Sequence, residues 1–338
     1  MPRGVPFIFI EFIGSSAVVN LGEYTNEGET KKVAVKTLNC CRADVIKEIE
    51  ALSSCKHDNV IAFIGSSAVV NLGEYTNEGE TIKVAVKTLN CCRADVIKEI
   101  EALSSCKHDN VIAFIGWMEI DDEMKIITEY LSGGDLHSYL TNPNKILKIS
   151  TIFSYIFQVL DAMIFMSHKH IIHRDLSARN CLLDETFECL KISDFGLARL
   201  TNVDYEYLPE TNRPLPFRWL PLEAFKGGNF SVKGDIWSIG ILIWELFERG
   251  ACPYKNLFYP EVVEYLASGK RLVRPEQCPK QLYTVMSECW NENPINRPTF
   301  DAIKEDIKAV YSYLKLYEPE KLNMIIEVTG VEISSASN

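Results

Sequence analysis

Two short motifs in the second half of the chain carry three oxygen-bearing side chains that suit a catalytic metal site. The first motif, HRDLSARN, spans His173–Asn180, and the second, DFG, spans Asp194–Gly196. The letters CLLD and LKIS between them are typical of two short strands. Asp175, Asn180 and Asp194 should therefore lie on loops held by paired strands, where catalytic groups are often found. Oxygen ligands of this kind suit Mg²⁺, a hard cation. Either motif alone could be a set of turn residues, but both in this order predict a metal site.

The elements that must position these loops change from strand-like to helical along the chain. Residues 83–89 (KVAVKTL) form a β-branched run typical of a strand, and residues 93–108 space their apolar side chains as a helix does. Residues 110–120 and 124–131 read as further strands. Beyond them, four helices are predicted over residues 150–170, 233–250, 279–290 and 300–317. Strands first and helices later predict an α+β fold, with a small β-rich lobe joined to a larger helical lobe.

Composition limits the class of protein. The 338 residues are 47% hydrophobic and 24% charged, which suits a globular protein of one large or two modest domains. A formal net charge of −11 provides no basic field for nucleic acid, so no nucleic-acid partner is expected. The apolar stretches at residues 5–14 and 238–247 are shorter than the roughly 18 residues of a membrane span. Eleven cysteines without a C-x-x-C pair favour free thiols in a reducing compartment, so we expect a cytoplasmic location.

The first third of the chain contains a near-identical repeat. Residues 12–65 match residues 63–116 at an offset of 51, and the single difference is Lys31 against Ile82. Repeat arrays have periods of this size, but they need about three units to enclose a core. Only two units are present here, and the rest of the chain does not carry the period. The repeat is therefore a local duplication inside another fold.

The two motifs, together with VAVK at residues 84–87, resemble those of the protein kinase family, and within it the protein tyrosine kinases. The resemblance covers about residues 63–314. It implies a bilobal kinase fold, ATP and Mg²⁺ as cofactors, and phosphoryl transfer to protein substrates. By this resemblance Asp175 is the catalytic base, and Asn180 and Asp194 hold the metal.

The same resemblance assigns an ion pair to the β-rich lobe. Lys87 would contact the α- and β-phosphates from its strand, and Glu99 on the predicted helix would pair with Lys87. Without the surrounding motifs, each residue would more simply be a solvated charge on a strand or a helix.

The glycine-rich loop of this chain departs from the kinase pattern G-x-G-x-x-G-x-V. The corresponding residues are Phe63, Gly65, Ala68 and Val70, so one of three glycines remains. Glycine lets backbone amides approach phosphate closely. The departure weakens the expectation of tight nucleotide binding.

Two features indicate tyrosine rather than serine as the acceptor. Ser177 stands two residues after Asp175, where serine/threonine kinases usually have lysine, and Arg179 stands four residues after Asp175, as in the receptor-type form. LPFRWLPLEAF, residues 215–225, resembles the tyrosine-kinase substrate platform, in which Pro216 and Trp219 would form a shelf for a phenol side chain. By the same resemblance, Asp235 supports the catalytic loop and Glu223 pairs with Arg297.

The nucleotide site is also implied by the resemblance. The hinge would be Glu129-Tyr130-Leu131, whose backbone would bond adenine, with Thr128 as a small gatekeeper. Asp135 would reach the ribose, although an N-cap of the next helix is an equally good interpretation. The purine would be enclosed by Val70, Ala85 and Leu182, which could otherwise be ordinary core residues.

A regulatory segment is predicted between DFG and the substrate platform. Residues 200–217 contain Tyr205 and Tyr207. A phosphate adds about −1.5 to −2 charges, and Arg174 and Arg199 are candidate partners for it. We predict that phosphorylation of Tyr207 orders this loop; the alternative is that both are surface tyrosines without a regulatory role.

The repeat can now be interpreted as a duplicated part of the N-terminal lobe. The second copy runs directly into the hinge, whereas use of the first would require 51 residues to loop out, at a cost of about 3.5 kcal/mol plus a constant. The expected units are an extra partial copy at 1–62, the N-lobe and hinge at 63–131, the C-lobe at 132–320 and a tail at 321–338. The extra copy is inert, inhibits by competing for the helical lobe, or is an error in the derived sequence.

The predicted function is transfer of the γ-phosphoryl group of ATP to protein tyrosine, with Mg²⁺. The rival hypothesis is a pseudokinase that binds partners without turnover, which the altered glycine loop favours and the complete set of charged site residues opposes. The chain could also be the cytoplasmic part of a membrane receptor, although no span in it shows this.

Overall fold

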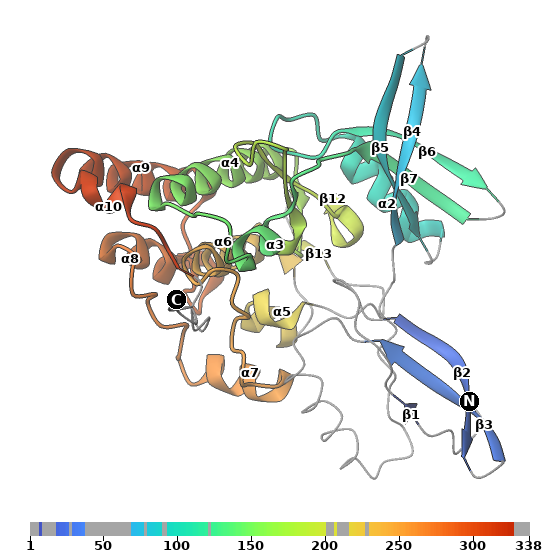
Figure 1. The fold of residues 1–338 in the computed structure, drawn as a ribbon. Helices are drawn as coiled ribbons and strands as arrows, with labels where there is room; N and C mark the ends of the chain where they lie inside the picture. The colour runs from blue at the N-terminus through green and yellow to red at the C-terminus, as the bar shows by residue number, and fades with distance from the viewer. Residues whose placement is uncertain are drawn as a thin grey trace, which may run out of the picture.

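The computed structural model describes residues 7–8, 18–26, 29–37, 69–77, 80–89, 93–120, 123–200, 206–207, 216–226 and 230–327. The chain begins with β-sheets and continues as a mainly helical region (Figure 1). The predicted α+β fold is confirmed.

A four-stranded antiparallel sheet forms the β-rich part next to the helical region. Its strands are β4 (Val69–Asn77), β5 (Glu80–Leu89), β6 (Phe114–Ile120) and β7 (Glu123–Glu129), in the order β4-β5-β7-β6. Helix α2 (Arg93–Ser104) follows β5. Val84 and Ile126 are 2% and 1% exposed. Val84 lies opposite Glu129 and Ile126 lies opposite Lys87, so the two buried side chains are on different faces of the sheet.

In the first copy of the repeat, β2 (Val18–Asn26) and β3 (Glu29–Thr37) form a separate sheet, which β1 (Phe7–Ile8), from the residues before the copy, completes. The hairpins of the two copies have the same register: Val18 pairs with Thr37 as Val69 pairs with Thr88. They differ in the strand added to the hairpin. β1 runs parallel to β3 over two residues, whereas β7 runs antiparallel to β5 over six, from Val84 to Leu89.

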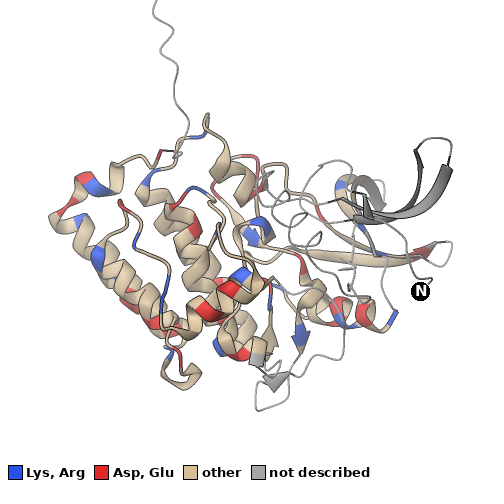
Figure 2. Cartoon of the chain, turned by 90° about the horizontal axis from the view of Figure 1, so that it is seen from below, with Lys and Arg blue, Asp and Glu red and all other residues tan. Residues whose placement is uncertain are grey.

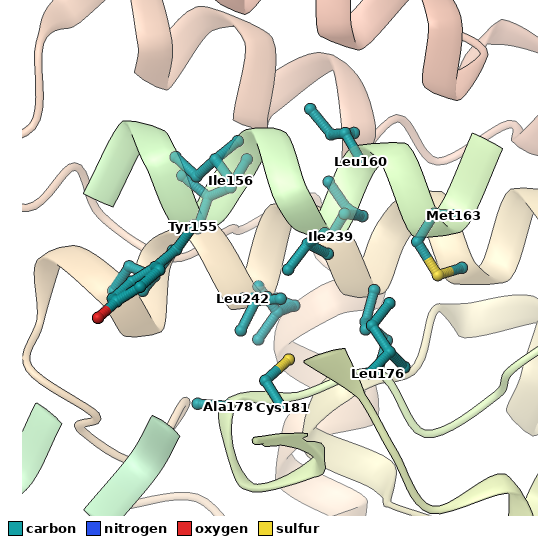
Figure 3. Close-up of a cluster of buried hydrophobic side chains, with 14 of the residues drawn as sticks. Tyr155, Ile156, Leu160, Met163, Leu176, Ala178, Cys181, Ile239 and Leu242 are labelled. Atoms are coloured by element: carbon teal, nitrogen blue, oxygen red, sulfur yellow. The ribbon is translucent and has the colours of Figure 1, made fainter. Parts of the chain in front are cut away.

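The helical region is built around two apolar helices. α4 (Ile149–His168) and α6 (Val232–Phe247) lie close to the sequence-predicted ranges. α4 is long and apolar enough to cross a membrane, with a mean hydropathy of 1.6, but its apolar side chains pack into the core. Figure 3 shows Ile239 and Leu242 of α6 between α4 and the residues Leu176 and Ala178. The core thus reaches the segment that carries the predicted catalytic base.

The other helices surround this pair. They are α3 (Leu136–Thr141), α5 (Leu222–Lys226), α7 (Tyr259–Ala267), α8 (Lys280–Cys289), α9 (Phe300–Tyr317) and α10 (Pro319–Asn323). α9 begins after Thr299, whose hydroxyl accepts from the Ala302 N–H, a typical N-cap. Acidic and basic side chains are intermixed along these helices (Figure 2).

Short strand pairs and 3₁₀ turns hold the loops between the helices. The pairs are β10 (Cys181–Leu183) with β8 (Gly134–Asp135) and β11 (Leu190–Ile192), β9 (Ile171–Ile172) with β12 (Arg199–Leu200), and β13 (Glu206–Tyr207) with β14 (Phe230–Ser231). The 3₁₀ turns are η1 (Ala178–Asn180), η2 (Phe195–Leu197), η3 (Phe217–Trp219) and η4 (Pro294–Asn296). The motif residues lie at the ends of these small elements.

Candidate active site

The HRDLSARN loop is held by a buried carboxylate at the start of α6. The backbone N–H groups of His173 and Arg174 donate to the two oxygens of Asp235, at 2.7 and 2.8 Å. Ser231 caps α6 and so fixes the turn that carries Asp235. Burial raises the pKa of Asp235, while the two backbone donors oppose the shift. The support expected from the sequence is present.

Asp175 lies on this loop with its side chain 15% exposed. The Arg179 guanidinium donates to its carboxylate, and the Asn180 side chain donates to its backbone carbonyl at 2.6 Å. Burial raises the pKa of Asp175 to about 6, and the Arg179 charge opposes this. Arg179 also lies over the Trp219 ring, 4.5 Å from its centroid. One guanidinium therefore links the predicted base to the predicted substrate platform.

The two predicted metal ligands are brought together by the β10–β11 pair. Cys181 lies opposite Ile192, and the next step of the ladder is a bond from the Ser193 N–H to the Asn180 carbonyl, at 2.8 Å. Asn180 and Asp194 consequently come from adjacent backbone positions.

The described residues include no cluster of three His, Cys, Asp or Glu side chains suited to a metal. Mg²⁺ does not require one, since it is often bound by one or two carboxylates together with waters and substrate phosphates. Asn180 and Asp194 fit such a site. Asp194 has a backbone φ of 56°, in the left-handed region that non-glycine residues rarely adopt, and its carboxylate accepts from the Gly196 N–H at 3.2 Å.

Lys87 joins the β-rich and helical parts of the site. Its ammonium lies 2.7 Å from Glu99 on α2 and 2.7 Å from Asp194. Burial lowers the pKa of Lys87, but the Asp194 and Glu99 charges outweigh it and raise the pKa above its ordinary value. The Lys87 charge in turn lowers the pKa of Asp194, against the effect of burial. Lys87 is therefore charged at neutral pH.

Strand register places the predicted purine-binding residues on one face of the sheet. Val70 lies directly opposite Lys87, and Ala85 lies opposite Thr128. Residues opposite each other in an antiparallel pair share a face, as do alternate residues of one strand. Val70 is 60% exposed, so this part of the face is open to solvent.

The hinge is tied to the helical lobe by an ion pair. The Glu129 carboxylate accepts from the Lys191 ammonium at 2.7 and 2.9 Å and from the Ala113 N–H at 2.7 Å. The Glu129 N–H also donates a hydrogen bond to the Ala113 carbonyl, at 3.0 Å. Leu131 is partly buried against the core. This use of the Glu129 side chain was not predicted from the sequence.

Asp135 acts as an N-cap. Its carboxylate accepts from the Ser138 N–H at 2.8 Å and from the Ser138 hydroxyl at 2.6 Å, at the start of α3. The N-cap role of Asp135 is present, and its contact with a ribose stays a prediction. Leu182 lies opposite Asp135 in the β8–β10 pair and is partly buried.

Four residues singled out in the sequence lie outside the described residues: Phe63, Gly65 and Ala68 of the glycine-rich loop, and Tyr205. Tyr207 is described by its backbone, which pairs with Phe230. Of the two arginines predicted to meet a phosphate, Arg174 is buried and donates through Nε to the Leu197 carbonyl at 2.6 Å. Arg199 is 2% exposed and lies 3.2 Å from Asp95 on α2.

One known protein family matches most of the chain. The family described as protein tyrosine and serine/threonine kinase matches residues 64–307, well over half of the chain. The chain belongs to this family. The kinase match begins in the second copy of the repeat, so it leaves almost all of the first copy outside.

Curated relatives narrow the family to its tyrosine kinase members. Mouse tyrosine-protein kinase Srms is 37% identical over 70% of this chain and 48% of its own length. The tyrosine-protein kinase receptor svh-2 of Caenorhabditis elegans is 39% identical over 68% of this chain and 22% of its own length. The Drosophila tyrosine-protein kinase transmembrane receptor Ror is 36% identical over 71% and 36%. The chain thus contains a protein tyrosine kinase domain and spans between about a fifth and a half of these relatives.

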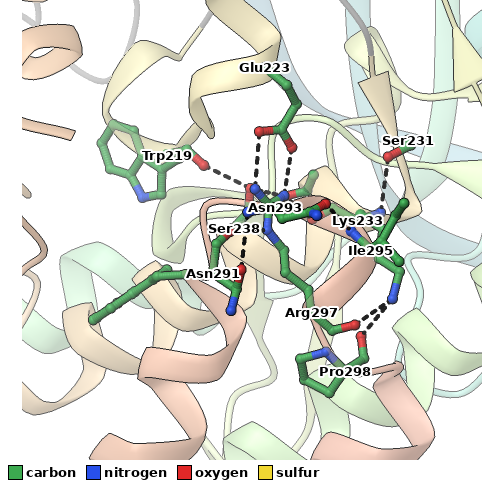
Figure 4. Close-up of polar contacts among 12 residues, drawn as sticks. Trp219, Glu223, Ser231, Lys233, Ser238, Asn291, Asn293, Ile295, Arg297 and Pro298 are labelled. Atoms are coloured by element: carbon green, nitrogen blue, oxygen red, sulfur yellow. Dashed lines mark hydrogen bonds and ion pairs between the residues drawn. The ribbon is translucent and has the colours of Figure 1, made fainter. Parts of the chain in front are cut away.

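An ion pair joins Glu223 on α5 to Arg297 after η4 in the helical lobe of the kinase domain. Arg297, whose side chain is fully buried, donates to both oxygens of Glu223 at 2.6 and 3.0 Å (Figure 4). It also donates to the Lys233 carbonyl at 2.8 Å and lies over the Trp237 ring. The pair expected from the sequence is present.

Two acidic residues of the kinase domain were missed by sequence reasoning. Glu245 in α6 accepts from the Ala178 N–H at 3.1 Å and from the Trp219 indole at 2.9 Å. Burial raises the pKa of Glu245 to about 7, and these two bonds oppose the shift. The sequence feature that could have identified Glu245 is its position as a single acidic residue in an apolar run. Acidic residues are seldom buried without partners, so a partner was to be expected. The second residue is Asp95, the partner of Arg199. It lies one helical turn before Glu99, and this spacing could have predicted that both acids share one face of the helix.

Proposed function

We propose that this kinase domain transfers the γ-phosphoryl group of ATP to tyrosine hydroxyls of proteins, with Mg²⁺. The observation that carries the proposal is the position of Lys87, whose ammonium lies 2.7 Å from both Glu99 and Asp194. Such an arrangement provides a fixed positive charge beside the residues that suit a metal. Positioning and charge neutralisation are the main requirements of phosphoryl transfer.

In this proposal Lys87 contacts the α- and β-phosphates and is oriented by Glu99. Asn180 and Asp194 hold Mg²⁺, which when bound neutralises charge on the phosphates. Asp175 orients the acceptor hydroxyl and receives its proton, with Arg179 fixing the carboxylate. The nucleotide would be held by residues of both lobes: Gly65, Val70, Ala85, Thr128, the hinge backbone at Glu129 and Leu131, Asp135 at the ribose, and Leu182.

The tyrosine acceptor is supported by the platform as well as by the relatives. Trp219 is fixed from two sides, by the ring contact with Arg179 and by the bond from its indole to Glu245. A rigid aromatic shelf next to Asp175 suits a long phenol side chain better than a short hydroxyl. We therefore propose that the substrates are proteins with exposed tyrosine residues. The kinase domain would act in the cytoplasm, either as a cytoplasmic protein or as the cytoplasmic part of a receptor.

The direct test is phosphotyrosine formation by purified protein given ATP, Mg²⁺ and a tyrosine-containing peptide. The matched control is Asp175→Asn, which removes the base and keeps the size of the side chain. Phosphotyrosine in the wild type and none in the control is the expected result. Folded wild-type protein that forms none would contradict the proposal.

The second candidate function is a pseudokinase that binds partners without turnover. It is favoured by Phe63 and Ala68 at two of the three glycine positions. A thermal shift with ATP and Mg²⁺ separates the candidates further, because a ligand stabilises the fold that binds it. Stabilisation without phosphotyrosine would support the pseudokinase; an active enzyme would exclude it.

We also propose that phosphorylation of Tyr207 raises activity by ordering its loop. The support is the pairing of the Tyr207 backbone with Phe230, whose ring lies 4.9 Å from the Arg174 guanidinium, together with the negative charge that a phosphate adds. The test compares phosphorylated wild type with Tyr207→Phe. A clear excess of activity in the phosphorylated protein is expected, and equal activities would refute this regulation.

A further inference from the structure

Helix α2 carries two buried carboxylates on one face. Asp95 and Glu99 are four residues apart, so they lie one above the other on the helix, and they are 5% and 2% exposed. Glu99 meets Lys87, as described above. Asp95 meets the Arg199 guanidinium on β12, with Nη2 and Oδ1 3.2 Å apart.

Arg199 connects this contact to the DFG segment. Its Nη1 donates to the carbonyls of Gly196 and Ala198, at 3.2 and 2.8 Å. The same guanidinium therefore follows the backbone just after Asp194 and reaches α2. The orientation of the helix is tied to the segment that carries a proposed metal ligand.

The buried pair is favourable only while both partners are present. Each charge has lost its contact with water, and removing one partner leaves the other buried without compensation. A rotation of α2 that separated Glu99 from Lys87 would also pull Asp95 away from Arg199, because both acids belong to one helical face. The pair thus resists the motion that would disassemble the site.

We propose that Asp95 is a positioning residue that holds α2 through Arg199, so that Glu99 meets Lys87 without a phosphate on the loop. The inference rests on the proposed kinase activity. It also defines what a phosphate on Tyr207 can do, since the phosphate would have to displace Asp95 to reach Arg199. Phosphorylation should then act on the loop and on peptide binding more than on α2.

The experiment uses the full chain with Tyr205→Phe and Tyr207→Phe, so that no phosphate forms at these sites. Asp95→Asn removes the charge at constant size, and Glu101→Gln, on an exposed position of the same helix, is the matched control. Hydrogen exchange of the α2 amides without nucleotide is measured beside kcat and the KM values for ATP and peptide.

In Asp95→Asn we expect the α2 amides to exchange about tenfold faster and kcat/KM to fall about tenfold, with α6 amides unchanged. Glu101→Gln should match the unsubstituted protein in every readout. Asp95→Asn that behaves like Glu101→Gln would overturn the inference, as would faster exchange throughout the chain, which indicates a general loss of stability.

A second variant separates positioning from the effect of an uncompensated charge. Asp95→Asn combined with Arg199→Met removes both charges, and we expect α2 to exchange as fast as in Asp95→Asn alone. Restored α2 protection and activity would overturn the inference. If no variant, including the wild type, phosphorylates peptide, the proposed function fails, while the exchange of α2 still tests the role of Asp95.

Discussion

Glu245 shows how a single buried acid can connect two loops of the site and leave a signature in the stability of the protein. Its carboxylate oxygen accepts from the Ala178 N–H next to Arg179 and from the Trp219 indole. The HRDLSARN loop and the proposed substrate platform therefore share one acceptor.

The pKa of Glu245, about 7 in the folded protein against an ordinary value of 4.5, gives a pH prediction. The folded protein binds this proton more tightly than the unfolded chain, so the contribution to stability is complete below about pH 4.5 and is lost as the pH rises through about 7. Glu245→Gln removes this dependence. Urea unfolding should show the variant gaining up to about 3 kcal/mol relative to wild type across that range. Parallel stability curves would contradict the prediction.

Arg179 offers a second prediction at the residue scale. A planar guanidinium can lie over Trp219 and donate to Asp175 at once, whereas a lysine ammonium is a point charge without that geometry. Arg179→Lys should lower kcat/KM for a tyrosine peptide about tenfold and leave the KM for ATP unchanged. Steady-state kinetics with each substrate varied in turn measure this. A raised KM for ATP with an unchanged KM for the peptide would place Arg179 in nucleotide binding instead.

At the scale of elements, the packing of α6 against α8 is set by one small residue. A Cβ at Gly240 would lie 2.5 Å from the Trp290 indole nitrogen and 3.1 Å from the Cys289 Cβ. Trp290 is 1% exposed and has little room to move.

Gly240→Ala sets helix propensity against packing. Alanine would favour the helix by about 1 kcal/mol, but forcing a methyl group into a filled interior costs about 1–3 kcal/mol. Because the contacts include a buried ring, we expect a net loss of stability, seen as a lower midpoint of urea unfolding. Gly234→Ala, where the added Cβ would lie 4.0 Å from the Pro221 ring, is the matched control on the same helix. A more stable Gly240→Ala protein would contradict this expectation and would show that α8 shifts to make room for the methyl group.

Elements were predicted well where periodicity and motif spacing determine them. The helix expected at 150–170 is Ile149–His168, and Lys87 meets Glu99 as the kinase resemblance implied. Other contacts depend on the three-dimensional path of the chain. Asp95 and Arg199 are 104 residues apart, and no local pattern relates them. The capping contact of Asp135 likewise depends on the position of the Ser138 N–H.

At the scale of the whole molecule, the repeat allows a comparison that few proteins offer. Deleting residues 12–62 or residues 63–113 leaves one copy in either case, and the products differ at one position, Ile82 or Lys31. Ile82 is 43% exposed, so its replacement by lysine should change stability by no more than about 0.5 kcal/mol.

Both deletion products should therefore fold with similar melting temperatures and have equal kinase activity. Thermal unfolding and the phosphotyrosine assay measure this, with the full chain as reference. A large difference between the products would assign importance to the single substitution. Failure of both to fold would show that the domain needs both copies.

The bonds from His173 and Arg174 to Asp235 also have a consequence for the order in which the protein is made. The loop that carries Asp175 leaves the ribosome before the helix that fixes it, because Asp235 follows His173 by 62 residues. Until α6 has been translated, the backbone donors of the loop lack this acceptor. A nascent chain that ends before α6 therefore contains every motif from VAVK to DFG. It still lacks the carboxylate that fixes the backbone of the loop carrying Asp175. If the proposed activity holds, it would therefore arise only once α6 has been made and has folded against the loop.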